Sequence, residues 1–367
     1  MSAKKIAVLG AGNAARAMAG DMALRGHEVR LWESPAFEAG LKAIRESGNT
    51  LTLHGEVAGR AQLAVVTTDA AEAVRGADVV YCLMPSYGHA TAFDAVAPHL
   101  EAGQSVLLMP GNFGSIQLRA RLAARGLEND VLVGECDTIP YATRIQPDGT
   151  SLVFGLKDFM YIAAIPAART DELIRRLAPV FPIELRAHDD VLTVGLANTN
   201  MILHCPTLLM NAGRVESGER FRFYNDGMTE SVCRVMEAMD AERLAVGRAL
   251  GCKLISEYED AILNYGLART EGERLYDLFK DHPVYGNHGP DSPTSMTNRY
   301  LSEDVPFLLV PLSELGRATG VPTPTVDAVI TLAEAANGCS YRTAGRNLKN
   351  LRWKGLSPEE IKKAVRG

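Results

Sequence analysis

The chain has 367 residues, about twice the length of a typical single domain, which predicts two domains. Its hydrophobic content is 47% and its charged content 22%, so it can bury a sizeable core and lacks the composition of a disordered protein. The formal net charge of −6 argues against nucleic acid as the main partner, because phosphate binding needs a basic surface.

Cysteine spacing and apolar runs indicate the cellular compartment. The six cysteines are scattered, with no C-x-x-C pair and no metal-ligand spacing, so we expect reduced thiols and no bound metal. The apolar run at residues 6–9 is too short for a signal-peptide core, and no stretch approaches the roughly 18–20 apolar residues of a membrane span. We therefore expect a cytoplasmic protein that does not bind a membrane.

The first half of the chain alternates short apolar runs with helical segments. Strands are expected at residues 5–9, 28–33, 63–67, 78–84, 105–109, 131–135, 152–156 and 159–164, and helices at 14–25, 69–75, 88–100 and 115–125. This alternation predicts an α/β domain with a doubly wound parallel sheet.

The pattern changes in the second half, where helical segments dominate. They are expected at residues 191–210, 228–250, 254–265, 311–319 and 325–337. We place the boundary near residue 188, so that residues 1–188 form the α/β domain and residues 189–367 an all-α domain.

The first expected strand ends in a glycine-rich turn, Gly10-Ala11-Gly12-Asn13-Ala14-Ala15, which fits the pattern G-x-G-x-x-A. A strand before the turn and a helix after it are the context of the dinucleotide-binding fingerprint of a Rossmann domain. Gly10 permits the tight turn, Gly12 lets the backbone approach a pyrophosphate, and Ala15 permits close packing of helix on strand. The helix start at Asn13 and Ala14 offers N–H groups to the phosphates.

Glu33 stands at the end of the next strand, 23 residues after Gly10, where an acidic residue is expected to hydrogen-bond the adenine ribose. A carboxylate would repel a 2′-phosphate, and Ser34 rather than an arginine follows it. The sequence therefore favours NAD(H) over NADP(H) as the cofactor. The alternative is a glycine turn without a ligand, which would not require this agreement of strand, spacing and acid.

Two further loops are expected to face the cofactor. One begins at Pro85 and the other at Pro110-Gly111, and each follows an expected strand. Ligands of doubly wound sheets sit at the carboxyl ends of the strands, so both loops lie where a dinucleotide would bind.

Four polar residues share one face of an otherwise apolar helix in the second half. Asn200, His204, Thr207 and Asn211 lie at positions i, i+4, i+7 and i+11. One interpretation is a core histidine that is hydrogen-bonded to Asn200; the other is a site that acts on a substrate.

Two more segments carry candidate residues for substrate binding. Residues 296–306 place Arg299 five residues before Asp304, and residues 134–144 follow a strand and end in Thr143 and Arg144. The first segment could instead be a capping cluster at a helix start, and the second a surface loop with a solvated arginine.

Taken together, these residues resemble the opine dehydrogenase family, which includes the octopine and nopaline dehydrogenases. The resemblance covers nearly the whole chain. It rests on the segments 8–13, 200–204, 299–300 and 303–305, on Asn211, and on the runs Leu309-Val310-Pro311-Leu312-Ser313-Glu314-Leu315-Gly316-Arg317 and Val321-Pro322-Thr323-Pro324.

The resemblance implies a fold and a reaction. The fold is a Rossmann domain followed by a helical domain like that of 6-phosphogluconate dehydrogenase. The reaction joins an α-keto acid, with pyruvate as the expected one, to the amino group of an L-amino acid as an imine. NADH reduces this imine to an N-(1-carboxyalkyl)amino acid, and the enzyme also catalyses the reverse oxidation.

The resemblance also implies a catalytic pair, His204 and Asp304. Imine formation moves protons on and off a carbinolamine, so a group that titrates near neutrality is useful, and a nearby carboxylate would hold its tautomer and favour the imidazolium. Planar guanidinium groups bind carboxylates bidentately, so Arg299 is the first candidate for a substrate carboxylate and Arg144 the second. Thr143, Asn200 and Asn211 complete the expected substrate-binding set.

Two other functions remain open at this point. A hydroxy-acid or keto-acid reductase of the same architecture often uses a lysine on the first long helix of the second domain, but no lysine stands between Lys157 and Lys253. A non-catalytic NAD sensor would not need His204, Arg299 and Asp304 together. The amino acid, the keto acid, the physiological direction and the choice between monomer and homodimer are not fixed by the sequence.

Overall fold

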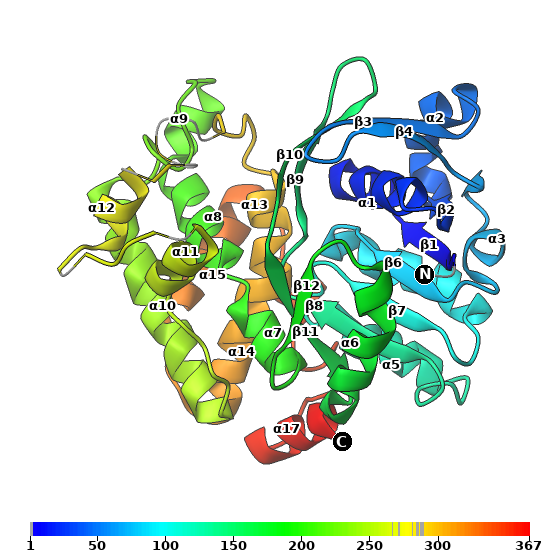
Figure 1. Cartoon of the computed structure of the whole chain (residues 1–367). Coiled ribbons are helices and arrows are strands. Elements are labelled where there is room, and N and C mark those ends of the chain that lie inside the picture. The colour runs from blue at the N-terminus through cyan, green and yellow to red at the C-terminus, as the bar shows by residue number, and fades with distance from the viewer. Residues whose placement is uncertain (1–2, 266, 271, 281, 284–285, 287–289) are drawn as a thin grey trace. The chain divides into compact units, whose positions relative to one another are not determined.

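The computed structural model describes residues 3–265, 267–270, 272–280, 282–283, 286 and 290–367. It divides into two compact units (Figure 1). The first contains residues up to 195 together with 364–367, and the second contains residues 196–363. No helix in the described ranges is both long and apolar enough to cross a membrane.

The first unit is built on an eight-stranded sheet with the strand order β12-β11-β8-β7-β6-β1-β2-β5. The strands are β1 (Lys5–Leu9), β2 (Glu28–Trp32), β5 (Val65–Thr67), β6 (Val79–Cys82), β7 (Ser105–Leu108), β8 (Leu132–Cys136), β11 (Phe159–Ile165) and β12 (Glu184–Ala187). From β1 the chain builds outward through β2 and β5, and then returns to the other side of β1 to add β6, β7 and β8. The order therefore reverses between β1 and β6, which makes their carboxyl ends the switch point where such sheets bind ligands.

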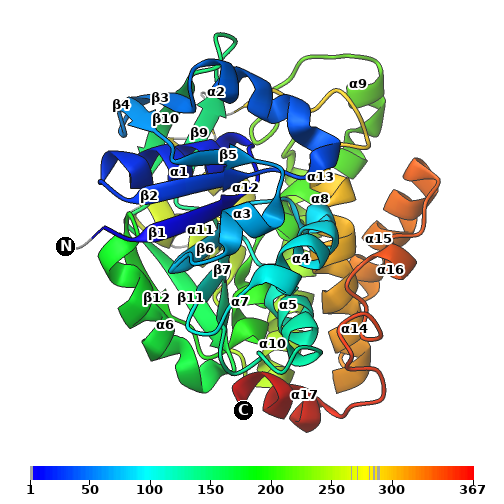
Figure 2. The same cartoon turned by 90° about the vertical axis from the view of Figure 1, so that its right-hand side faces the viewer.

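The predicted Rossmann-type domain is confirmed, but its sheet is not wholly parallel. All neighbouring pairs are parallel except β8 and β11, which are antiparallel. The chain between these two strands forms further strands instead of the crossover helix that a parallel connection needs. The main helices of the unit are α1 (Asn13–Leu24), α3 (Ala70–Val74), α4 (His89–Val96), α5 (Gly114–Ala123) and α6 (Thr170–Leu177), of which α3, α4 and α5 form a row (Figure 2).

A second, smaller sheet is the main feature of this unit that the sequence analysis missed. Its order is β4-β3-β10-β9, formed by β3 (Thr50–Gly55), β4 (Gly59–Gln62), β9 (Tyr141–Ile145) and β10 (Ser151–Leu156). Helix α1 packs against strands of both sheets. Gly20 contributes to this contact: a Cβ atom there would lie 2.3 Å from Cδ1 of Leu53, so a larger residue would force the Leu53 side chain to move. The helix that follows the glycine-rich turn is therefore held from two sides.

The regular secondary structure in the described residues of the second unit is helical, apart from one isolated bridge between Arg222 and Asp291. Its helices are α8 (Asn200–Met210), α9 (Ala212–Glu216), α10 (Glu230–Leu250), α11 (Glu257–Tyr265), α12 (Leu275–Lys280), α13 (Arg299–Ser302), α14 (Val310–Thr319), α15 (Pro324–Asn337), α16 (Tyr341–Ala344) and α17 (Pro358–Arg366), the last of which ends in the first unit. A π-helical turn at Val305–Leu309 joins α13 to α14. The predicted α-helical character of this half is confirmed.

The single helix predicted for residues 191–210 is wrong. The structure has α7 (Val191–Ala197) and α8, separated by two residues. Asn198 uses its side-chain oxygen to accept a hydrogen bond from the backbone N–H of Asn200 at 3.1 Å. This local turn satisfies an N–H group at the start of α8 and gives that helix its own beginning.

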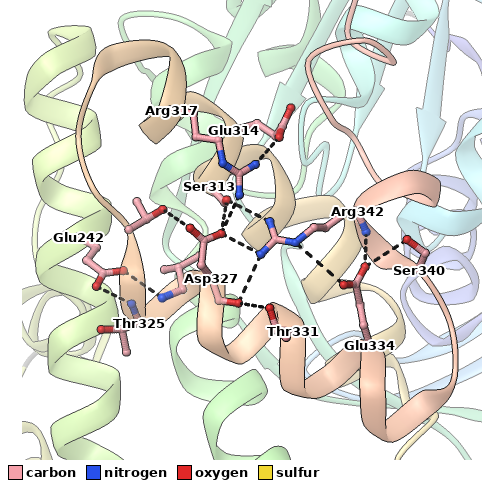
Figure 3. Close-up of polar contacts among 12 residues, drawn as sticks. Glu242, Ser313, Glu314, Arg317, Thr325, Asp327, Thr331, Glu334, Ser340 and Arg342 are labelled. Atoms are coloured by element: carbon pink, nitrogen blue, oxygen red, sulfur yellow. Dashed lines mark hydrogen bonds and ion pairs between the residues drawn. The ribbon is translucent and has the colours of Figure 1, made fainter.

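A polar network joins α10, α14, α15 and α16 (Figure 3). Asp327 accepts hydrogen bonds from Ser313 at 2.6 Å, Arg342 at 2.8 Å and Arg317 at 3.0 Å. Burial opposes ionisation of Asp327, but the hydrogen bonds from Ser313 and Arg342 and the two arginine charges lower its pKa overall. Glu242 accepts the N–H groups of residues 325 and 326 and so caps the start of α15.

Candidate functional site

The glycine-rich turn has the backbone that the fingerprint requires. Gly10 has a φ of +102°, and a Cβ atom there would lie 3.0 Å from the carbonyl oxygen of Leu83, so only glycine suits this position. Gly12 differs, because a Cβ atom there would meet nothing within 4 Å. Gly12 thus borders open space directly before the start of α1, which fits the close approach of a pyrophosphate. Ala15 is fully buried, and Ala14 is partly buried against the core.

Glu33 lies beside this turn. It is buried, and its carboxylate accepts hydrogen bonds of 2.8 Å from the backbone N–H groups of Ala11 and Ser34. These two bonds fix the conformation of the turn, and the contact of Glu33 with a ribose stays a prediction. Asn13, at the start of α1, connects the turn to the small sheet: its side-chain oxygen accepts a hydrogen bond from the backbone N–H of Ile145 on β9 at 2.7 Å.

The two proline loops follow β6 and β7, as predicted. Pro85 lies three residues after the last residue of β6. The second loop begins with a cis peptide bond before Pro110. Gly111 packs so closely on β8 that an added Cβ would lie 2.1 Å from Cβ of Glu135. Glu135 is fully buried and accepts the N–H groups of residues 113 and 115, each at 2.9 Å. This glutamate, which the sequence analysis did not single out, fixes the loop at the start of α5.

A buried hydrogen-bonded chain lies in the second unit. Nδ1 of His204 is 2.7 Å from Oδ2 of Asp304, although 100 residues separate them in the sequence. Nε2 of His204 is 2.7 Å from the hydroxyl of Tyr224. All three residues are buried, with 3–7% of their surface exposed. The ring of Tyr300 stacks on His204 at 3.9 Å between centroids, which fixes the plane of the imidazole.

This geometry assigns the histidine tautomer. A carboxylate only accepts hydrogen bonds, so Nδ1 carries a proton beside Asp304. Neutral His204 then accepts the Tyr224 hydroxyl at Nε2, and the imidazolium would donate to the Tyr224 oxygen instead. The alternative of a core histidine bonded to Asn200 is not what the structure shows, because Asp304 and Tyr224 are the bonded partners.

Arg299 is the first residue of α13 and lies within the same unit as His204. Its side chain is 53% exposed, and its Nε lies 3.4 Å from the carboxylate of the buried Glu303. The expected capping cluster is also present, since Asn298 accepts the N–H of Tyr300 at 3.1 Å. One segment therefore supplies a helix cap, an accessible guanidinium, the stacked tyrosine and the buried aspartate.

Comparison with known proteins identifies the family. Residues 187–337 match the model of the NAD/NADP octopine/nopaline dehydrogenase α-helical domain, and residues 5–126 match that of the NAD-dependent glycerol-3-phosphate dehydrogenase N-terminus. An opine dehydrogenase of Arthrobacter sp. (strain 1C) is 34% identical over 366 residues, which cover 100% of this chain and 99% of the relative. The chain belongs to the opine dehydrogenase family. It is therefore an NAD(P)-binding oxidoreductase that acts on CH–NH groups and condenses a keto acid with an amino acid under reduction, as predicted.

Solved structures of opine dehydrogenases share the fold. An octopine dehydrogenase in complex with NADH and agmatine superposes with a TM-score of 0.79 at 22% identity, covering 99% of this chain and 98% of the other. Yersinopine dehydrogenase bound to NADP⁺ gives a TM-score of 0.70 at 16% identity, with 100% and 98% coverage. Both cofactors thus occur on this architecture.

The remaining predicted substrate residues of this opine dehydrogenase fall into two groups. Asn200 and Asn211 lie in the second unit, at the start and just beyond the end of α8. Asn211 is buried, and its amide donates to the carbonyl oxygens of Thr207 at 2.8 Å and Gly227 at 2.9 Å. The two bonds together connect the end of α8, which contains Thr207, to Gly227, three residues after Tyr224, so Asn211 fixes the position of that segment.

Thr143 and Arg144 belong to the first unit, where they form part of β9 and not of the surface loop that was the alternative interpretation. Arg144 is exposed, whereas the hydroxyl of Thr143 is buried without a hydrogen-bond partner among the described residues. The strand was missed because its partner β10 follows only after a polar turn, and its own residues alternate weakly between buried and exposed.

The sequence analysis also missed Tyr224. It stands in a non-helical segment between α9 and α10, with no spacing rule that links it to His204. The run Phe221-Arg222-Phe223-Tyr224 was nevertheless a signal, because three aromatic residues within four positions of a loop are expected to be buried.

Proposed function

We propose that His204 and Asp304 are the catalytic pair of this opine dehydrogenase, with Tyr224 as a third member. The observation that carries this proposal is the buried chain Asp304–His204–Tyr224, with both hydrogen bonds at 2.7 Å. A histidine that is fixed by a carboxylate on one nitrogen is suited to exchange protons at the other.

The proton inventory of the reaction explains why such a group is needed. The amine attacks the keto carbon to give a carbinolamine, whose hydroxyl must gain a proton to leave as water and produce the imine. We assign that proton to His204, whose Nδ1 is held by the carboxylate of Asp304 at 2.7 Å. The reduced nicotinamide, when bound, supplies the hydride to the imine carbon. In the reverse oxidation His204 acts as the base that activates water.

Tyr224 determines how His204 exchanges that proton. Both ring nitrogens are bonded within the protein, so we propose that the proton passes from Nε2 through the Tyr224 hydroxyl to the substrate. A phenol can accept one proton while it donates another, which leaves Tyr224 neutral after each transfer. The bonds of Asn211 to residues 207 and 227 support this role by fixing the segment around Tyr224.

Arg299 is proposed to bind a substrate carboxylate. An N-(1-carboxyalkyl)amino acid carries two carboxylates, and a guanidinium binds a carboxylate as a two-pronged donor. Arg299 is exposed, and its ion pair with the buried Glu303 is made through Nε at 3.4 Å. Asn200, one turn before His204, is a proposed neighbour of the same substrate, and Arg144 with Thr143 remains the proposed contribution of the first unit.

We propose NAD(H) as the preferred cofactor and pyruvate as the keto acid. The open space at Gly12 fits a dinucleotide, and the buried carboxylate of Glu33 would repel a 2′-phosphate. The octopine dehydrogenase neighbours include complexes with NADH, L-arginine and pyruvate.

We propose the cytoplasm as the location of the protein. All six cysteines lie in the described part of the chain and are free thiols, as is usual for proteins of a reducing compartment.

The test is NADH oxidation by the purified protein with pyruvate, alone and with a panel of L-amino acids. Oxidation that requires both substrates supports the proposal, and replacing NADH by NADPH measures the cofactor preference. Oxidation with pyruvate alone would instead make the protein a keto-acid reductase. Tight NADH binding without turnover of any combination of keto acid and amino acid would favour the alternative function, a non-catalytic NAD sensor.

A further inference from the structure

Glu303 has a buried carboxylate beside Arg299, the proposed ligand of a substrate carboxylate. Its side chain is 3% exposed, and its Oε2 atom lies 3.4 Å from Nε of Arg299, four residues earlier in the chain. The next residue is Asp304, whose carboxylate is 2.7 Å from Nδ1 of His204. Two consecutive buried carboxylates therefore have different partners, an arginine and a histidine.

The backbone of Glu303 is hydrogen-bonded on both sides. Its N–H donates to the carbonyl oxygen of Arg299 at 2.9 Å, at the end of α13. Its carbonyl oxygen accepts the N–H of Phe307 at 3.1 Å, from the π-helical turn that follows. The side chain of Glu303 thus extends from a fixed backbone and is itself buried, so it offers a defined position to the longer side chain of Arg299.

The carboxylates of this segment also act on the charge of Arg299. Partial burial would lower the pKa of its guanidinium, but the charge of Glu303, followed by that of Asp304, raises this pKa overall. Within the described part of the chain, no other side chain forms a hydrogen bond or an ion pair with Arg299. The N–H groups on its two terminal nitrogens are therefore not used by the described residues.

Stability gives little reason for such a pair. A buried carboxylate loses its hydration, and an ion pair seldom repays that loss in full. Binding gives a better reason. An arginine loses side-chain freedom when it binds a ligand, and a contact that orders it beforehand reduces this cost.

We propose that Glu303 is a positioning residue, which holds the guanidinium of Arg299 in the orientation that binds the substrate carboxylate. The inference rests on the proposed role of Arg299 and adds the residue that orients it. Glu303 contacts Nε, and the terminal N–H groups bind the carboxylate as a planar pair. Because Asp304 follows directly, one segment orients both the arginine and the histidine.

The experiment is a double-mutant cycle of Glu303→Gln and Arg299→Ala. The kcat and both KM values are measured with NADH, pyruvate and the L-amino acid that gives the fastest turnover. Glu303→Gln should raise the KM of the substrate whose carboxylate Arg299 binds by about ten-fold, and should lower kcat by less than about three-fold, because His204 remains. In the Arg299→Ala background it should change this KM by less than about two-fold, because no guanidinium is left to orient.

Glu314→Gln is the matched control. It removes another carboxylate that pairs with an arginine of the same unit, Arg317, at 2.6 Å. Both KM values should stay at those of the wild type.

The outcomes separate this inference from the proposed role of Arg299. A KM that rises equally with and without Arg299 would show a general effect on the fold and overturn the inference. An unchanged KM in Glu303→Gln, beside a raised KM in Arg299→Ala, would also overturn it and leave the role of Arg299 intact. An unchanged KM in Arg299→Ala would remove that role and the inference together.

A second variant is available if Glu303→Gln does not fold. Glu303→Asp keeps the charge but shortens the side chain by one methylene group, so the carboxylate no longer reaches Nε. It should raise the same KM only when Arg299 is present, and an unchanged KM would overturn the inference.

Discussion

The two units of this dehydrogenase build their sites in different ways. In the first unit, a backbone turn and two loops at the carboxyl ends of β1, β6 and β7 form the site, and its side chains mainly brace that backbone. In the second unit, side chains from distant segments meet in a buried chain centred on His204. Under the proposed assignment of the two sites, cofactor binding depends on backbone shape, whereas catalysis depends on the identity of the side chains. Substitutions can separate the two.

The largest effect is expected from His204→Ala. Loss of the acid–base group should lower kcat by about 10²–10⁴-fold. The Kd for NADH should remain unchanged, because the glycine-rich turn lies in the other unit. Steady-state kinetics and fluorescence titration of NADH measure the two quantities. A variant with wild-type kcat would remove His204 from the mechanism.

Gly12→Val should produce the opposite pattern in the first unit. The unliganded fold has room for a side chain at Gly12, so the thermal midpoint should change little. The side chain would fill the space for the pyrophosphate, and the Kd for NADH should rise by about 100-fold, which corresponds to about 2.7 kcal/mol. Gly10→Ala is the matched control: its φ of +102° makes that variant unstable even without cofactor. If both variants lose the same amount of stability, Gly12 is needed for the fold as Gly10 is, and not specifically for cofactor binding.

Arg299→Lys should raise the KM of the substrate whose carboxylate Arg299 binds, the keto acid or the amino acid, by about ten-fold to 100-fold. The change keeps the charge but removes the planar fork, so kcat should fall less than KM rises. Initial rates over a range of keto-acid and amino-acid concentrations decide this. The control is Arg144→Lys, whose effect measures the second candidate in the same assay. An unchanged KM in Arg299→Lys excludes it as a carboxylate ligand.

Tyr224→Phe should lower kcat about ten-fold with little change in KM, because the ring remains and only the proton-transferring hydroxyl is lost. The pH profile of kcat should also shift, since Nε2 of His204 loses its partner. Tyr341→Phe is the control, as it removes one buried hydroxyl bonded at 2.7 Å to Asn337. If both variants behave alike, Tyr224 is structural.

The smallest effect concerns stability. Asp327→Asn should cost about 1–2 kcal/mol at pH 7, because its partly exposed carboxylate accepts charged hydrogen bonds. Its pKa is lowered in the fold, so this contribution is complete above the unfolded pKa of about 3.9 and is lost as the pH falls through the folded value. The difference from wild type in urea unfolding should therefore shrink below about pH 4. Asp171→Asn, on an exposed turn of α6, should show no such change.

The sequence predicted the features that depend on short-range order. The turn from Gly10 to Ala15 and the acid at Glu33 follow from fixed spacing along a strand–turn–helix unit. His204 and Asp304 were paired only through the resemblance, since no local rule joins residues 100 positions apart. Tyr224 was missed for the same reason.

The small sheet shows the same limit in the fold. Its strands β3 and β10 pair across almost 100 residues, and although residues 152–156 were expected to form a strand, no local pattern identifies β3 as its partner. The break before α8 did have a local signal, the polar run Asn198-Thr199-Asn200, but the apolar residues on both sides favoured one continuous helix. The pairing of β3 with β10, in contrast, is not encoded by local propensity.

The position of α1 between two sheets has a consequence for how the cofactor binds. The helix start and the turn before it are already ordered by Glu33, Asn13 and the packing at Gly20. Little conformational entropy then remains to be lost when a dinucleotide arrives, so more of the contact energy appears as affinity. Association of NADH is accordingly expected to be a single fast phase whose rate increases linearly with nucleotide concentration, without a slow ordering step.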